Sequence, residues 1–172
     1  MGAKHKNKRR NVTHELPRRE WTDAEIDRML DEILPLDDPK KLHLTQCRIA
    51  EQLGRGRELP ARSKHYGVGR SRKPVELALW KIASGYGRFG RYIPNMRLSR
   101  RGRAWTWMDR EILWIAFSPE YDAAKSAKFK TDERVAPPTI EFIAGVLARP
   151  VEEITAAVTT YVFRRPEMGF GL

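Results

Sequence analysis

The sequence predicts an all-α protein built from two three-helix units, and three observations favour this fold class. Apolar residues recur at the spacing of an amphipathic helix in several segments of the 172-residue chain. Threonines that can cap a helix stand directly before two of these segments. Blocks of similar residues also recur in the same order in both halves of the chain, which is typical of an internal repeat.

The first unit opens on a capping box, which Thr22 and Glu25 form ahead of an apolar face over residues 25–34. We expect Thr45 to cap the second helix of this unit. A long insertion, GRGRELPARSKHYGV, follows the second helix where a helix-turn-helix normally has a turn of about 3–4 residues. We expect the insertion to form an exposed basic loop.

The third helix is expected to begin near Ser71, which can cap it, with Pro74 tolerated in its first turn. Gly85 can end this helix in a left-handed conformation. Its inward face is apolar and consists of Val75, Leu79 and Ile82. Trp80 lies off that face, and packing under the basic loop is the interpretation that we favour for it.

Three blocks recur in the second half, and they predict a diverged tandem repeat. The matching blocks are Trp21, Thr22, Glu25 and Met29 with Trp105, Thr106, Asp109 and Leu113; Ile49, Ala50 and Leu53 with Ile143, Ala144 and Leu147; and Arg70, Val75, Leu79 and Ile82 with Arg149, Ile154, Val158 and Tyr161. The second unit carries its own long insertion earlier, over residues 118–138.

These patterns divide the chain into five segments. They are a basic flexible arm (1–18), a first helix-turn-helix unit (19–85), a basic linker of Gly, aromatic and Arg residues (86–102), a second helix-turn-helix-like unit (103–165) and a tail (166–172).

The charge is strongly positive and unevenly distributed. The formal net charge is +11 and the pI is about 10.1. Residues 54–103 alone hold fourteen Lys and Arg against two acids, Glu58 and Glu76, so this block carries a charge of +12. Such a block favours a polyanionic partner, and we expect nucleic acid in preference to an anionic membrane.

Several classes of protein are disfavoured by what the sequence lacks. The single cysteine, Cys47, forms no internal disulfide, and no apolar run is long enough to span a membrane. We therefore expect an intracellular protein, in the cytoplasm or nucleoid, or in the nucleus if the source is eukaryotic. No phosphate-binding loop, nucleophile elbow, dinucleotide fingerprint or metal-ligand set is present, so we expect no enzyme activity, no metal and no cofactor.

Three motifs together resemble Myb/SANT-like, homeodomain-like helix-turn-helix repeats. They are W-T-x-x-[DE]-x-x-x-[LM], I-A-x-x-L and R-x-x-x-x-[VI]-x-x-x-[LV], and they cover residues 19–85 and 103–165. The resemblance implies that the third helix lies in the major groove of DNA while the first two helices support it. In the first unit its outward positions would be Arg72, Lys73, Glu76, Leu77 and Lys81.

The candidate nucleic-acid-binding residues lie in the arm, the insertion, the third helix and the linker. They are Lys6, Lys8, Arg9, Arg10, Arg55, Arg57, Arg62, Lys64, Arg70, Arg72, Lys73, Lys81, Arg88, Arg91, Arg100, Arg101 and Arg103. The linker also holds three aromatic residues, which either stack on unpaired bases or pack on the adjacent units: Tyr86, Phe89 and Tyr92.

Our leading hypothesis is a protein that binds double-stranded DNA, as a transcriptional regulator or as another site-recognition factor in packaging or replication. The alternative is a SANT-like protein-interaction module whose basic linker binds RNA or single-stranded DNA. The expected last helix presents Glu152 and Glu153 and no cation, so it suits a protein partner or self-association better than DNA. We expect no membrane partner.

Overall fold

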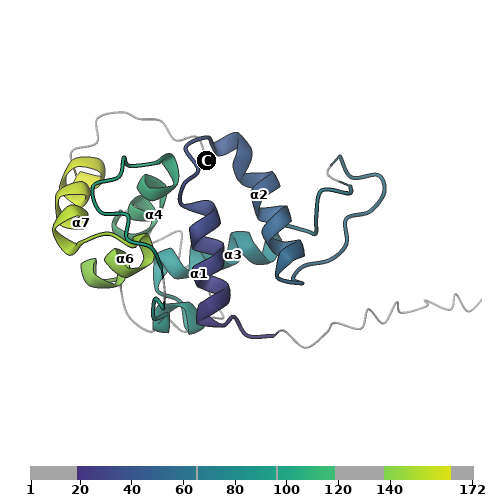
Figure 1. Cartoon of the computed structure of the whole chain (residues 1–172), viewed down its shortest axis with the longest axis horizontal. Helices are drawn as coiled ribbons and strands as arrows, with labels where there is room; N and C mark the ends of the chain where they lie inside the picture. The colour runs from purple at the N-terminus through teal and green to yellow at the C-terminus, as the bar shows by residue number, and fades with distance from the viewer. Residues whose placement is uncertain (1–18, 65, 96, 119–137, 164–172) are drawn as a thin grey trace, which may run out of the picture.

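The computed structural model describes residues 19–64, 66–95, 97–118 and 138–163, and every regular element within these ranges is helical, as the sequence predicts (Figure 1). In chain order the elements are α1 (Asp23–Ile33), α2 (Pro39–Gln52), α3 (Lys73–Ser84), the 3-10 helix η1 (Gly87–Arg91), α4 (Trp107–Phe117), α6 (Ile140–Leu147), α7 (Val151–Val158) and the π-helical turn η2 (Thr159–Phe163).

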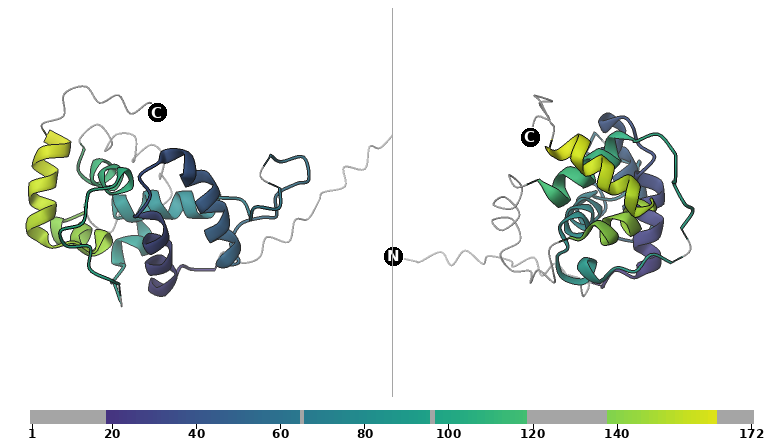
Figure 2. Two further views of the ribbon diagram at one scale, coloured as in Figure 1. Left: turned by 45° about the horizontal axis from the view of Figure 1, so that its top comes forward. Right: turned by 90° about the vertical axis from the view of Figure 1, so that its left-hand side faces the viewer.

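Helix α3 lies at the centre of the molecule. It contacts α2, η1, α4 and α6, whereas α1 packs on α2, and α6 packs on α7. Figures 1 and 2 show α2 on one side of α3 and the later helices on the other. The buried apolar side chains of both halves form one continuous core, so burial of α3 holds the two halves together.

Two capping boxes predicted from the sequence are confirmed. The Thr22 hydroxyl accepts the Glu25 N–H at 3.2 Å, and the Glu25 carboxylate accepts the Thr22 N–H at 3.0 Å. Thr106 and Asp109 form the same pair at the start of α4, at 3.2 and 3.1 Å. Each box satisfies amides that have no partner inside the helix.

The predicted starts of α2 and α3 are wrong. Helix α2 begins at Pro39, where the Asp38 carboxylate caps it, and Thr45 is buried inside the helix. Proline suits a first helical position because its missing N–H would have no partner there. Ser71 does not cap α3, because Arg72 holds the N-cap position and no side chain caps the helix. The Ser71 N–H donates to the Arg57 carbonyl at 2.8 Å, at the base of the preceding loop.

Helices α2 and α6 end in the same way. Gly54 and Ala148 both adopt a left-handed conformation, with φ of 61° and 53°. The following residues, Arg55 and Arg149, donate their N–H groups to carbonyls near the ends of α2 and α6, at 2.7 and 3.0 Å. Each terminus therefore turns sharply and aims an arginine back at its own unit.

Arg55 holds the start of α1 in place. Its guanidinium stacks over the Trp21 ring at 4.1 Å from the centroid and contacts the Glu25 carboxylate at 2.9 Å. It also donates to the carbonyls of Arg19 and Glu20, each at 2.9 Å. The side chain is only 10 % exposed, so it serves packing inside the protein.

Arg149 makes the corresponding set of contacts at the start of α4. It stacks over Trp105 at 4.1 Å, contacts the Asp109 carboxylate at 3.0 Å and donates to the carbonyls of Arg103 and Ala104. Its side chain is fully buried.

The contacts correct one sequence match. Arg70 and Arg149 stand five residues before Val75 and Ile154 respectively. Arg55, however, makes the contacts that Arg149 makes. Arg70 instead reaches Glu51 at 3.1 Å. Arg55 is the second residue of the insertion, and the rest of the insertion separates this arginine from α3 along the chain while leaving its contacts intact.

Candidate nucleic-acid interface

Residues 86–95 and 97–101 form a strap that lies against α1 and is not a free linker. Three aspartates, spaced four residues apart, form an acidic stripe along that helix: Asp23, Asp27 and Asp31. Arg88 forms an ion pair with Asp23, and Arg97 Nε donates to Asp31 at 2.8 Å. The acids of α1 thus neutralise Arg97 and also Arg88, which the sequence predicts to bind nucleic acid.

Two strap arginines are internal. Arg97 is 2 % exposed in its side chain and donates to the carbonyls of Gly145 and Val146 at the end of α6. Arg100 forms an ion pair with the buried Asp109 and donates to the Leu34 carbonyl at 3.2 Å. Both cations stabilise the fold, so the predicted phosphate contact through Arg100 does not fit this structure.

The strap aromatics pack on the protein. Tyr86, Phe89 and Tyr92 are all buried, and the Phe89 ring lies 5.9 Å from that of Trp21. Burial and the hydroxyl's hydrogen bond to Asp27 raise the pKa of Tyr92 well above its ordinary value. These rings present no face to an unpaired base. Of the two interpretations, stacking on bases and packing on the protein, the structure therefore supports packing.

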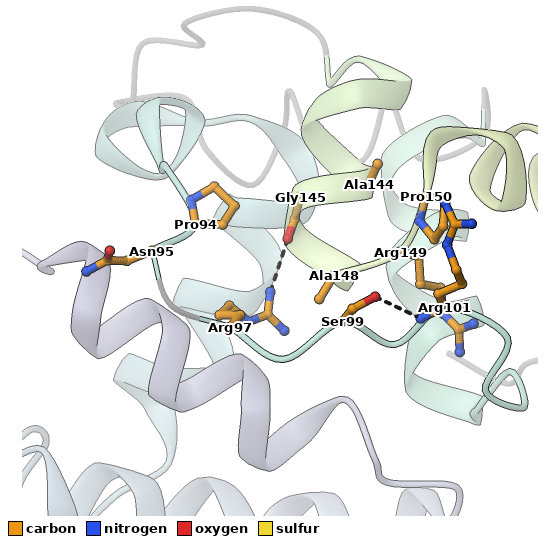
Figure 3. Close-up of a pocket in the computed structure, with 10 residues that line it drawn as sticks. All are labelled: Pro94, Asn95, Arg97, Ser99, Arg101, Ala144, Gly145, Ala148, Arg149 and Pro150. Atoms are coloured by element: carbon orange, nitrogen blue, oxygen red, sulfur yellow. Dashed lines mark hydrogen bonds between the residues drawn. The ribbon is translucent and has the colours of Figure 1, made fainter.

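A shallow groove runs between the strap and the α6–α7 turn (Figure 3). Arg97 crosses it to reach the Gly145 carbonyl, and the Ser99 hydroxyl accepts the Arg101 N–H at 3.3 Å. Arg149 also lines the groove, but its charge is matched by Asp109. With its buried guanidiniums already paired, the groove offers little to an additional anion.

Most of the insertion belongs to a loop, described over residues 56–64 and 66–70, that protrudes from the end of the molecule opposite α7 (Figure 1). We call it the protruding loop. Its base is fixed to α2, because the Arg70 N–H donates to the Cys47 carbonyl at 3.2 Å. A Cβ atom on Gly69 would lie 2.4 Å from that carbonyl oxygen, so only glycine allows this close approach.

The tip of the protruding loop is exposed and cationic, as the sequence predicts for the insertion. Arg62 and Lys64 are exposed there, and no Asp or Glu occurs between residues 59 and 69. Arg57, nearer the base, is exposed as well. The tip therefore places positive charge well away from the acids of α1.

The N-terminal end of α3 extends this cationic surface. Lys73 is exposed and Arg72 half-buried, and both lie 3.5 Å from the Glu76 carboxylate. The remaining outward positions predicted for α3 are half-buried: Glu76, Leu77 and Lys81. Trp80 is half-buried and packs against the hydrophobic core. Neighbouring helices cover much of α3, so its first turn is its most accessible part.

An exposed cation beside the protruding loop is absent from the residues predicted from the sequence. Arg48 lies on α2 beside the base of the protruding loop, where the chain at Gly69 passes close to its backbone N–H. The helical pattern of α2 could have suggested Arg48 as an exposed cation, because Arg48 lies off the apolar face that holds Ile49 and Ala50.

The other candidate residues are scattered or lie elsewhere. Arg91, Arg101 and Arg103 are exposed on or beside the strap, and Arg101 lies 3.3 Å from the Glu152 carboxylate. The arm residues lie outside the described part of the chain: Lys6, Lys8, Arg9 and Arg10. The structure thus gathers six cations at one end of the molecule, which we call the cationic end: Arg48, Arg57, Arg62, Lys64, Arg72 and Lys73.

No protein-family model, curated protein or solved structure matches the chain. Within the described ranges, no helix has the length and apolar character needed to cross a bilayer. Among the same residues, no three His, Cys, Asp or Glu side chains gather as a metal site would require.

Proposed function

We propose that this chain binds double-stranded DNA through its cationic end. The observation that carries the proposal is the protruding loop, which presents Arg62 and Lys64 without an acidic residue between positions 59 and 69. The first turn of α3 follows the base of this loop and contributes two cations that favour phosphate, the exposed Lys73 and the half-buried Arg72. Cations on a projecting loop reach a phosphate backbone without requiring the core to open.

We further propose that the chain is a tandem pair of diverged Myb/SANT-like helix-turn-helix units. The matching stacks of Arg55 on Trp21 and of Arg149 on Trp105 support it. The capping boxes and the left-handed ends of α2 and α6 provide independent support, because they occur at corresponding places in the repeat. Regulation of transcription is the use that we propose first, and packaging or replication would need the same surface.

The two units would have different roles. The first turn of α7 holds Glu152 and Glu153, where the first turn of α3 holds Lys73 and a single acid, Glu76. Glu153 accepts the Gly102 N–H at 2.8 Å and contacts Arg149 at 3.1 Å. We propose that the second unit supports the first one structurally and leaves an acidic end that DNA would avoid.

The alternative, an RNA-binding or single-strand-binding linker, loses its physical support. The aromatic rings of the strap are buried, and Arg88, Arg97 and Arg100 are engaged by the acids of α1 and α4. Binding through these groups would require the strap to leave the core.

Fluorescence anisotropy with a labelled random-sequence duplex tests the proposal. Arg62→Glu/Lys64→Glu reverses two charges on the protruding loop, and Arg101→Glu/Arg103→Glu makes the same change in net charge near α7. The loop variant should lose at least tenfold in duplex affinity, and the control variant should lose much less. Equal loss in both variants would show that net charge alone governs binding and would refute the assigned surface.

The salt dependence provides a second test. Contacts from roughly five cations predict a slope of about −4 to −5 when log Kobs is plotted against log salt concentration. The loop variant should reduce the magnitude of this slope by about 2, because two phosphate contacts are removed. An unchanged slope would place the phosphate contacts elsewhere.

A further inference from the structure

The protruding loop carries an aromatic side chain that its cationic role does not explain. Tyr66 is 63 % exposed, whereas the strap aromatics Tyr86, Phe89 and Tyr92 are buried. An exposed tyrosine at the tip of a loop contributes nothing to the core. It lies two residues from Lys64 and four from Arg62, which are both exposed.

The loop is preorganised to hold this ring away from the protein. The Tyr66 N–H donates to the Ser63 carbonyl at 3.0 Å, and the Ser63 N–H donates to the Pro60 carbonyl at 2.7 Å. At the base, Ser71 pairs with Arg57, and Gly56 approaches Ser71 so closely that a Cβ atom would lie 2.5 Å from its carbonyl oxygen. A backbone held at tip and base lowers the entropy cost of presenting a side chain to a ligand.

The surroundings of Tyr66 favour a nucleic acid over a protein partner. The tip combines an aromatic ring with cations and lacks acids, which suits phosphate combined with a flat base. In an intact duplex each base is covered on both faces by its neighbours, and only its edges reach the grooves. The face of a tyrosine ring therefore finds its natural contact on a base that has left the stack.

We propose that Tyr66 stacks on an unpaired base while the surrounding cations hold the adjacent duplex. The preferred ligand is then a DNA duplex that contains a bulged or otherwise unpaired nucleotide. This inference rests on the proposed duplex binding and adds to it a structural feature of the DNA that the loop selects. Stacking of one base is worth about 1–3 kcal/mol, which corresponds to roughly fivefold to 150-fold in affinity.

The test compares two labelled DNA molecules of equal length and sequence, one fully paired and one with a single bulged 2-aminopurine. The full-length protein is compared with Tyr66→Ala and with Tyr66→Phe, which keeps the ring. Anisotropy reports affinity for each DNA, and 2-aminopurine fluorescence reports stacking directly. Thermal unfolding of each variant checks the fold, which should be unaffected because Tyr66 is exposed.

The wild type and Tyr66→Phe should bind the bulged duplex at least fivefold more tightly than the paired one and quench 2-aminopurine. Tyr66→Ala should bind both DNAs with the affinity of the paired duplex and leave the fluorescence unquenched. Equal wild-type affinity for the two DNAs, or a preference that survives in Tyr66→Ala, would overturn the stacking inference and leave duplex binding intact. Failure of the wild type to bind either DNA would refute the proposed function itself.

Discussion

Replacement of Asp109 by asparagine should destabilise the protein far more than the corresponding change at Glu25. The Asp109 carboxylate is fully buried and contacts two arginines, Arg100 and Arg149, whose side chains are 9 % and 0 % exposed. Asparagine keeps the shape and an acceptor oxygen but removes the negative charge. Arg100 then lacks a counter-charge, and Arg149 keeps only the partly exposed Glu153 at 3.1 Å. Breaking a buried ion pair in this way costs about 3–5 kcal/mol.

Glu25→Gln is the matched control. Glu25 occupies the same place in its capping box, but its side chain is 14 % exposed and its partner Arg19 is largely solvated. Arg55 also keeps its stack on Trp21 and its bonds to two carbonyls. The expected loss is about 1–2 kcal/mol, from the cap and a partly exposed ion pair.

Urea unfolding followed by circular dichroism measures both free energies of unfolding by linear extrapolation. The slope m should be unchanged in both variants, because the surface exposed on unfolding is the same. Losses within about 1 kcal/mol of one another would refute the reasoning. They would mean that the two arginines around Asp109 find other compensation and that their burial carries no special electrostatic cost.

Two further predictions concern helix ends. Burial raises the pKa of Glu25, but hydrogen bonds from Arg55 and Thr22 outweigh it and leave the pKa below the ordinary 4.5. The stability that this carboxylate contributes is therefore present above pH 4.5 and is lost as pH falls through the lowered pKa. The urea midpoint should consequently fall less steeply with acid in Glu25→Gln than in the wild type. Ala148→Gly should stabilise the protein by about 0.5–1 kcal/mol, because φ of 53° strains alanine, and Gly54→Ala should have the opposite effect in the same thermal assay.

Local signals predicted much of the fold. Thr22 and Thr106 are followed by acids at the spacing of a capping box, and that geometry depends only on neighbouring residues. Gly85 ends α3 in the left-handed conformation for the same reason. Thr45 was wrongly predicted to start α2, because a threonine inside a helix and a threonine at its start look alike in sequence. Asp38 followed by Pro39 indicates the true start of this helix.

The candidate site was harder to predict because charge pairing is a tertiary property. Arg88 and Arg97 appear in sequence as part of a free cationic block, about 65 residues from the aspartates that they contact. The spacing of Asp23, Asp27 and Asp31 is visible in the sequence as a helical stripe. It identifies an acidic face but not which of the many arginines covers it. The exposed insertion was predicted because it holds four Lys and Arg against a single acid, Glu58, and has no apolar periodicity of its own.

The position of the insertion suggests how the proposed DNA-binding surface can be accommodated without disturbing the core. Arg55 makes its contacts with the start of α1 before the protruding loop begins. Arg149 makes the corresponding contacts with the start of α4, directly before Pro150 and α7. Removal of residues 56–70 would place Arg55 five residues before Val75, the distance that separates Arg149 from Ile154.

We therefore expect the shortened chain to fold with a free energy of unfolding close to that of the full chain, because loop closure costs little and the removed residues contribute no buried apolar side chain. It should also lose most of its affinity for duplex DNA in the anisotropy assay. A chain that folds and still binds would move the interface away from the loop. A chain that fails to fold would show instead that the bonds from Arg70 and Ser71 to Cys47 and Arg57 stabilise the first three helices, and that the insertion is a structural part of the unit.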